Sequence, residues 1–171
     1  MIYIIIILLI FSAFFSSLET ALFHLKPTSK KNKIVKKLLK NPKKLLSNLL
    51  TGNTIVNIAI GSLSAAYTLN YVSPHSNLSI SNLLLIQVSI ITLIILIFGE
   101  VIPKTYAIAK SESLANSSAK ILNIILKIIY PIAFIFHKLT DLLMEILPIK
   151  KEQAFDSEEE LIMLAEVGEE E

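Results

Sequence analysis

The chain has 171 residues, of which 53% are hydrophobic and none is Cys or Trp, and its formal net charge is +2. The absence of cysteine excludes disulfides and thiolate metal sites. All 16 basic residues are lysines, nine of them between Lys26 and Lys44, whereas Asp156 to Glu171 holds eight acids and no base. Such segregation indicates membrane topology more than ligand binding, and we expect an integral membrane domain and not a soluble one.

The first predicted element covers residues 2–24. Met1 to Leu18 carries no charge, and an apolar run of about 18 or more residues is long enough to cross the hydrocarbon layer as a helix. A cleaved secretory signal is the alternative, but the segment lacks a basic start and a clear small-residue cleavage site. We therefore predict a membrane-spanning helix.

Residues 26–44 are rich in lysine, and their apolar residues recur at helical spacing, which predicts a basic helical hairpin beside the membrane. Lysines of this kind favour an anionic cytoplasmic leaflet by about 1 kcal/mol each. Nucleic acid is the other partner that lysines could contact, and beside a membrane helix we do not expect it.

Two further crossings are predicted over residues 45–72 and 83–102, separated by a lysine-free loop over 71–82. The positive-inside rule places the lysine-rich segment in the cytoplasm. The N-terminus is then outside, and after three crossings the C-terminus is cytoplasmic. We expect a multi-pass protein of the plasma membrane.

Residues 114–147 are apolar enough to suggest a fourth crossing, but they carry one polar stripe. Its members are Asn116, Lys120, Lys127, Lys138 and Glu145. A fourth span would bury Lys127 near mid-bilayer and carry the acidic tail outside. We therefore predict an interfacial belt helix bent at Pro131. The fold class is an all-α membrane protein with three transmembrane helices, a basic juxtamembrane helical hairpin and this belt.

Polar stripes also run along the first two predicted spans. Ser12, Ser16 and Glu19 share one face of the first, and a second stripe holds Asn53, Asn57, Gly61 and Ser64. Each stripe alone is more typical of helix packing, with Glu19 close enough to the interface to be solvated. Two such stripes on neighbouring helices favour a shared polar cavity.

The most specific feature is Gly99–Glu100 followed by Pro103–Lys104. Pro103 removes an amide hydrogen and displaces the carbonyl of Gly99, so we expect a broken helix beside a carboxylate at membrane depth. An all-oxygen set of this kind suits Mg²⁺, Ca²⁺ or Na⁺. The alternative is a Glu100–Lys104 pair that ends a helix near the headgroups. No catalytic arrangement is evident, and we do not expect an enzyme.

Three motifs in this order resemble the transmembrane domain of the CNNM/CorC family: SAFFSSLETAL (Ser12–Leu22), LLTGNTIVNIAIGSLSA (Leu49–Ala65) and LIFGEVIPKTYA (Leu96–Ala107). The resemblance implies a homodimeric Mg²⁺ transporter, generally an exporter coupled to Na⁺. Residues 1–148 would be its transmembrane domain and 149–171 the start of a cytoplasmic acidic helical bundle. ATP would bind only to a CBS pair, which this sequence does not contain.

The resemblance also implies a dehydrated Mg²⁺ site between the first helix and the broken third span. Its residues would be the hydroxyls of Ser12 and Ser16, the carbonyl of Gly99 and the carboxylate of Glu100, with Asn53 and Asn57 on the facing helix and Lys104 as charge partner. Leu18 departs from the family pattern, which often has a small or polar residue there. The rival hypotheses are a membrane anchor and dimerisation scaffold for a cytoplasmic CBS module, in which the stripes only pack helices, and a channel-like pore.

Overall fold

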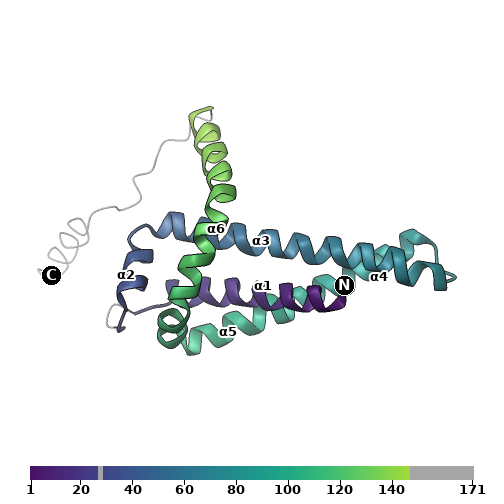
Figure 1. Ribbon diagram of the computed structural model, residues 1–171, viewed down its shortest axis with the longest axis horizontal. Coiled ribbons are helices and arrows are strands. Elements are labelled where there is room, and N and C mark those ends of the chain that lie inside the picture. The colour runs from purple at the N-terminus through teal and green to yellow at the C-terminus, as the bar shows by residue number, and fades with distance from the viewer. Residues whose placement is uncertain (27–28, 147–171) are drawn as a thin grey trace, which may run out of the picture. The chain divides into compact units, whose positions relative to one another are not determined.

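The computed structural model describes residues 1–26 and 29–146, and within them every regular element is a helix (Figure 1). Contacts divide the chain into two compact units, Met1–Phe134 and Ile135–Glu171, and the features below belong to the first. The predicted all-α class is confirmed. The predicted domain boundary after residue 148 lies outside the described residues.

Within residues 1–26 and 29–146, three helical stretches are long and apolar enough to cross a membrane: Ile2–Phe23, Pro42–His75 and Ile80–Ala109. The first is α1 (Ile2–Phe23), close to the predicted range. The second consists of α3 (Pro42–Tyr67), the π-helix η1 (Thr68–Val72) and the short 3₁₀-helix η2 (Ser73–His75). The prediction of three spanning helices is confirmed by their number, length and composition.

The connection between the second and third spans is shorter than predicted. Helical structure continues to His75 and resumes at Ile80, so the expected loop over 71–82 is reduced to four residues. Pro74 lies in the first turn of η2, where its missing N–H costs no hydrogen bond. Ser79 then caps the next helix, because its side chain accepts a hydrogen bond from the Asn82 amide.

The third span is one continuous run of helix, made of α4 (Ile80–Ile94), the π-helix η3 (Ile95–Val101) and α5 (Ile102–Ala109). The prediction that this span ends near residue 102 in a broken helix is therefore wrong. The irregularity lies where it was expected, but as a π-helix: the Ile102 amide donates to the Ile97 carbonyl, five residues back. This wider turn directly precedes Pro103, so the missing amide falls in the first turn of α5.

The lysine-rich segment contains α2 (Lys33–Leu39), whose N-terminus is capped by the Asn32 side chain. Helix α2 packs against α3, and its Val35 is fully buried. Asn32 also donates two hydrogen bonds to Asn116 of α6: its backbone amide donates to Asn116 Oδ1 at 2.8 Å, and its Nδ2 donates to the Asn116 carbonyl at 2.9 Å. These bonds fasten the start of the lysine-rich helix to α6.

Helix α6 (Ser111–Ile146) is continuous through Pro131. Its inner face repeats at helical spacing and is buried, with Ala115, Ala119, Leu122 and Leu126. Lys120 and Lys127, from the predicted polar stripe, are exposed. An interfacial position of α6 and a bend at Pro131 remain predictions.

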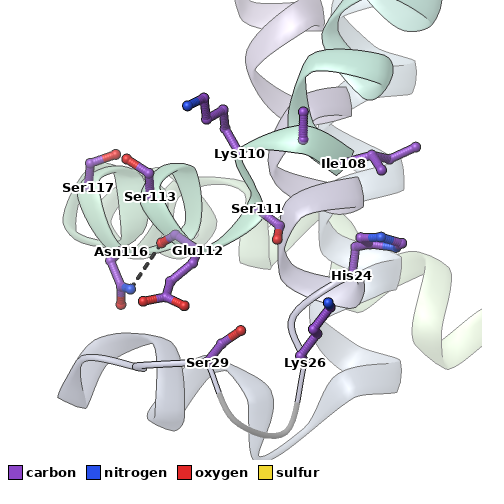
Figure 2. Close-up of a pocket in the computed structure, with 11 residues that line it drawn as sticks. His24, Lys26, Ser29, Ile108, Lys110, Ser111, Glu112, Ser113, Asn116 and Ser117 are labelled. Atoms are coloured by element: carbon purple, nitrogen blue, oxygen red, sulfur yellow. Dashed lines mark hydrogen bonds between the residues drawn. The ribbon is translucent and has the colours of Figure 1, made fainter.

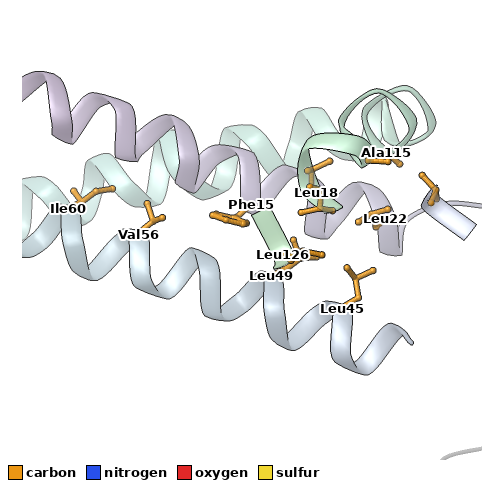
Figure 3. Close-up of a cluster of buried hydrophobic side chains, with 12 residues drawn as sticks. Phe15, Leu18, Leu22, Leu45, Leu49, Val56, Ile60, Ala115 and Leu126 are labelled. Atoms are coloured by element: carbon orange, nitrogen blue, oxygen red, sulfur yellow. The ribbon is translucent and has the colours of Figure 1, made fainter. Parts of the chain in front are cut away.

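The hydrophobic core is formed mainly by α1, α3 and the first half of α6 (Figure 3). Phe15 and Leu18 of α1 pack in one cluster with Leu49 and Ile60 of α3 and with Leu126 of α6. Gly52 of α3 allows this packing, because a β-carbon there would lie 2.9 Å from the ring of Phe15 and 2.9 Å from Cδ1 of Ile129. The core therefore fixes the axial position of the central part of α1 relative to α3.

Candidate cation site between the spans

A cluster of oxygen atoms lies where α1 meets α3 and the third span. Ser12, near the middle of α1, is fully buried, and its Oγ lies 3.1 Å from Oδ1 of Asn53 and 2.7 Å from Oδ1 of Asn57. The two Asn residues are four positions apart on α3, so their side chains share one face. The structure thus brings together Ser12 from the first predicted stripe and Asn53 and Asn57 from the second.

Two amide oxygens converge on the single hydroxyl hydrogen of Ser12. A serine hydroxyl has one hydrogen and can donate it to only one of the two amide oxygens at a time. The other contact then brings two oxygen lone pairs together. Converging hydroxyl and amide oxygens are suited to a bound cation.

Gly99 of η3 lets the third span approach Ser12 closely. Gly99 is buried, and a β-carbon on it would lie 2.8 Å from Ser12 Oγ and 3.4 Å from Ser12 Cβ. Real β-carbons do not approach other atoms so closely, so a larger residue would push α1 and η3 apart. Glycine is therefore required at position 99, because the backbone of η3 approaches the Ser12 hydroxyl closely there.

The carboxylate of Glu100 joins the same cluster from the third span. Asn57 Nδ2 donates to Glu100 Oε1 at 3.4 Å, and Glu100 is partly buried. Within the part of the chain that the structure describes, no group of three or more His, Asp or Glu side chains could hold a metal ion. A cation in this cluster would therefore be held by one carboxylate and several neutral oxygens.

Ser16, one turn after Ser12 on α1, is fully buried, and its Oγ has no hydrogen-bond partner among the described residues. Toward the end of α1, Glu19 Oε2 lies 4.0 Å from Nζ of Lys104. Ser16 thus lies between two contacts of α1 with the third span, the Ser12–Gly99 approach and the Glu19–Lys104 pair. A buried hydroxyl without a partner is unfavourable and suits a ligand position.

Lys104 is not paired within its own helix, contrary to what the alternative interpretation predicted. Its ion pair is with Glu19 of α1, and the alternative of a Glu100–Lys104 pair within one helix is not what the structure has. Glu19, interpreted from sequence as a solvated residue, has a side chain only 21% exposed. Because the π-helix η3 lies directly before α5, the direction of Lys104 could not be obtained by counting residues of a regular helix.

Sequence reasoning missed the polar partner of Ser64. Gln87 of α4 donates through Nε2 to Ser64 Oγ at 2.9 Å. The indication available from sequence was one amide inside an otherwise apolar run. Gly61, by contrast, marks no close contact within the chain, since nothing lies within 4 Å of the position of its β-carbon.

A separate pocket of about 930 Å³ lies where the end of α1 and the end of α5 meet the start of α6 (Figure 2). It is lined by His24, Lys26, Lys110, Glu112, Asn116 and several serines. None of the predicted site residues lines it. Its lysines disfavour a bound cation, so the oxygen cluster between the spans is the better candidate.

The chain is similar to known membrane proteins. Residues 3–171 match the family model described as Cyclin M transmembrane N-terminal domain. A UPF0053 protein of Haemophilus influenzae is 34% identical over 97% of this chain and 41% of its own length. The UPF0053 inner membrane protein YfjD of Escherichia coli is 30% identical over 81% of this chain and 33% of its own length. The chain therefore spans less than half the length of these relatives.

Proposed function

Because the chain belongs to the Cyclin M transmembrane N-terminal domain family, we propose that it is the membrane domain of a transporter that binds and moves Mg²⁺. The observation that carries the proposal is the convergence of the Ser12 hydroxyl with the amide oxygens of Asn53 and Asn57. Glu100, bonded to Asn57, supplies the negative charge. Ser16 and the carbonyl of Gly99 complete the proposed set of ligands.

The chemistry of the donors supports a hard cation. Hydroxyl, amide and carboxylate oxygens are the ligands that Mg²⁺ prefers, and the chain has no thiolate that would favour a softer metal. Six oxygens in a buried cluster would replace the water shell of the ion. Such a dehydrated ion near the middle of the spans resembles the arrangement in secondary transporters, whose sites lie at irregular helix positions near the midplane.

We further propose that transport is efflux coupled to Na⁺. Neutral oxygens serve Na⁺ as well as Mg²⁺, and the single carboxylate offsets the whole charge of Na⁺ and half of the charge of Mg²⁺. In this proposal the membrane domain does not bind ATP, because ATP would act only through a CBS pair in another part of a longer chain.

The proposed topology places the N-terminus outside the plasma membrane, and the lysines around α2 and the C-terminus in the cytoplasm. The natural absence of cysteine allows a direct test. Asn77→Cys, in the connection before α4, should react with a membrane-impermeant maleimide on intact cells. Lys40→Cys should react only after the cells are opened, and the reverse pattern would overturn the topology.

The transporting unit in the proposal is a homodimer. Gly61 has open space above it and is followed on α3 by Ala65 and Ala66, which are small residues of the kind that let two helices pack closely. Gly61→Leu should shift the purified protein from dimer to monomer in light scattering. An unchanged mass would move the interface to another face.

The test of function compares Glu100→Gln with the unmodified chain in two assays: Mg²⁺ titration calorimetry in detergent, and Mg²⁺ flux in proteoliposomes under an opposing Na⁺ gradient. Glu112→Gln is the matched control, since Glu112 is exposed in the first turn of α6, away from the cluster. Loss of saturable binding and of flux only in Glu100→Gln supports the transporter. Equal binding in all three proteins contradicts the site.

A membrane anchor and dimerisation scaffold for a cytoplasmic CBS module is the second candidate. It is favoured by the chain's coverage of less than half of each relative, which leaves room for a larger soluble part in those proteins. A scaffold predicts no Mg²⁺ flux in proteoliposomes at any Na⁺ gradient. A large and unselective conductance would instead indicate a channel-like pore.

A further inference from the structure

A second buried polar group lies close to the connection between α3 and α4. Gln87 is only 8% exposed, and its Nε2 donates to Ser64 Oγ at 2.9 Å. Its Oε1 is buried and has no hydrogen-bond partner within residues 1–26 and 29–146. A buried amide oxygen that accepts nothing is unfavourable unless a positive group binds it.

One hydroxyl, that of Ser64, contacts the Gln87 amide, and a second, that of Thr68, follows one turn later on the same helical face. Ser64 Oγ accepts from Gln87 and keeps a second lone pair. Thr68 is four residues further along the same helical face, is buried, and begins the π-helix η1, which packs against α4. The Gln87 amide oxygen and the Ser64 hydroxyl lie between α3 and α4, and the buried Thr68 is the nearest further hydroxyl along this face of α3.

This group is separate from the oxygen cluster around Ser12. Ser64 is seven residues beyond Asn57 on α3, which corresponds to about 10 Å along the helix axis. Ile60, fully buried, lies between them. On the third span, Ile91 and Ile95 lie between Gln87 and Gly99 and pack against the same hydrophobic cluster as Ile60. An apolar layer therefore divides the two polar groups.

The charge of the group selects its ligand. Gln87, Ser64 and Thr68 carry no formal charge, and no Asp or Glu lies between Thr68 and Phe98. Burial of a divalent ion without a carboxylate would be far more costly than burial of a monovalent one. Amide and hydroxyl oxygens are hard donors, so a small alkali cation is the ligand that they suit.

We propose that Gln87, Ser64 and Thr68 form a second cation site, for Na⁺, separated from the Mg²⁺ cluster by the isoleucine layer. The inference rests on the proposed function for its place in transport, because it gives the coupling ion a position of its own near the α3–α4 connection. The binding itself does not depend on transport and can be measured alone.

The experiment follows the thermal unfolding midpoint of the purified chain while NaCl replaces choline chloride at constant ionic strength. The unmodified chain should show a saturable rise with Na⁺. Gln87→Leu should abolish the rise, and Ser64→Ala, which removes a smaller group, should weaken Na⁺ affinity at least tenfold. Ser89→Ala is the matched control, since the exposed Ser89 bonds only to the Leu85 carbonyl of its own helix.

Gln87→Glu tests the charge argument in the opposite direction, because it adds a carboxylate of nearly the same shape. It should tighten cation binding at least tenfold and make the midpoint sensitive to Mg²⁺ at this site as well. A Na⁺ response unchanged in Gln87→Leu and Ser64→Ala would overturn the inference and leave the pair as a packing contact.

Glu100→Gln separates this inference from the proposed function. Loss of Mg²⁺ binding with a retained Na⁺ response supports two sites. A Na⁺ response that is lost in Glu100→Gln and kept in Gln87→Leu places Na⁺ in the Ser12 cluster and overturns the second site. A chain that binds Na⁺ through Gln87 but never binds Mg²⁺ keeps the second site and contradicts the proposed function alone.

Discussion

The hydroxyl oxygen of Ser12 lies 2.8 Å from the position that a β-carbon on Gly99 would occupy. This relationship sets the distance between α1 and the third span at the level of the oxygen cluster. It also couples two properties that are usually separate, helix packing and the position of ligand atoms. The variants below are chosen to measure each property by itself.

Gly99→Ala should weaken Mg²⁺ binding at least tenfold. Its methyl group would push Ser12 away from the cluster, and overpacking of this kind costs about 1–3 kcal/mol. Ser89→Ala is the control, because the exposed Ser89 bonds to the Leu85 carbonyl of its own helix. Calorimetry on both variants checks the prediction, and equal affinities would show that the close approach is unimportant for binding.

Ser16→Ala should separate stability from binding. Without Mg²⁺ we expect an unchanged or higher unfolding midpoint, because a buried hydroxyl without a partner costs about 1–3 kcal/mol. With Mg²⁺ the rise in midpoint should be smaller than in the unmodified chain. Ser17→Ala, whose hydroxyl bonds to the Phe14 carbonyl of its own helix, should retain the full rise. A full rise in Ser16→Ala would remove Ser16 from the ligands.

Glu19 and Lys104 should be energetically coupled, whereas Glu100 and Lys104 should not. The Glu19–Lys104 contact at 4.0 Å is partly exposed, and pairs of this kind contribute about 0.2–1 kcal/mol. Two double-mutant cycles, Glu19→Gln with Lys104→Met and Glu100→Gln with Lys104→Met, measure the two couplings by unfolding. A larger coupling to Glu100 would favour the pair within one helix over the contact between helices.

Gly52→Val should destabilise the protein by about 1–3 kcal/mol, because its side chain would overlap Phe15 and Ile129. Ile129→Val removes Cδ1, the atom of Ile129 that lies 2.9 Å from the position of the new β-carbon. The double variant should therefore recover part of the lost stability in thermal unfolding. Strict additivity of the two changes would mean that α6 does not pack over Gly52 as described.

The three spans and the two polar stripes could be predicted because each depends only on residues that are close together in the sequence. Apolar length identifies a span, and helical spacing places Ser12 and Ser16, or Asn53 and Asn57, on one face. The resemblance then brought both stripes to Gly99 and Glu100, and the structure places Ser12 beside Asn57 and Gly99.

The contacts that could not be predicted depend on the axial position of one helix against another. Glu19 meets Lys104, and Ser64 meets Gln87, only because the packing of Phe15 over Gly52 and the close approach of Ser12 to Gly99 fix those positions. The π-helix η3 adds a second difficulty, since it changes the direction of every side chain after it relative to a regular helix.

The two hydrogen bonds from Asn32 to Asn116 have a consequence for biosynthesis. The two residues are 84 positions apart, and the second and third spans lie between them. At about 5–20 residues per second, the ribosome adds Asn116 roughly 4–17 s after Asn32. During that interval α2 has no partner on α6. Its attachment to α6 can therefore form only after both following spans have been synthesised.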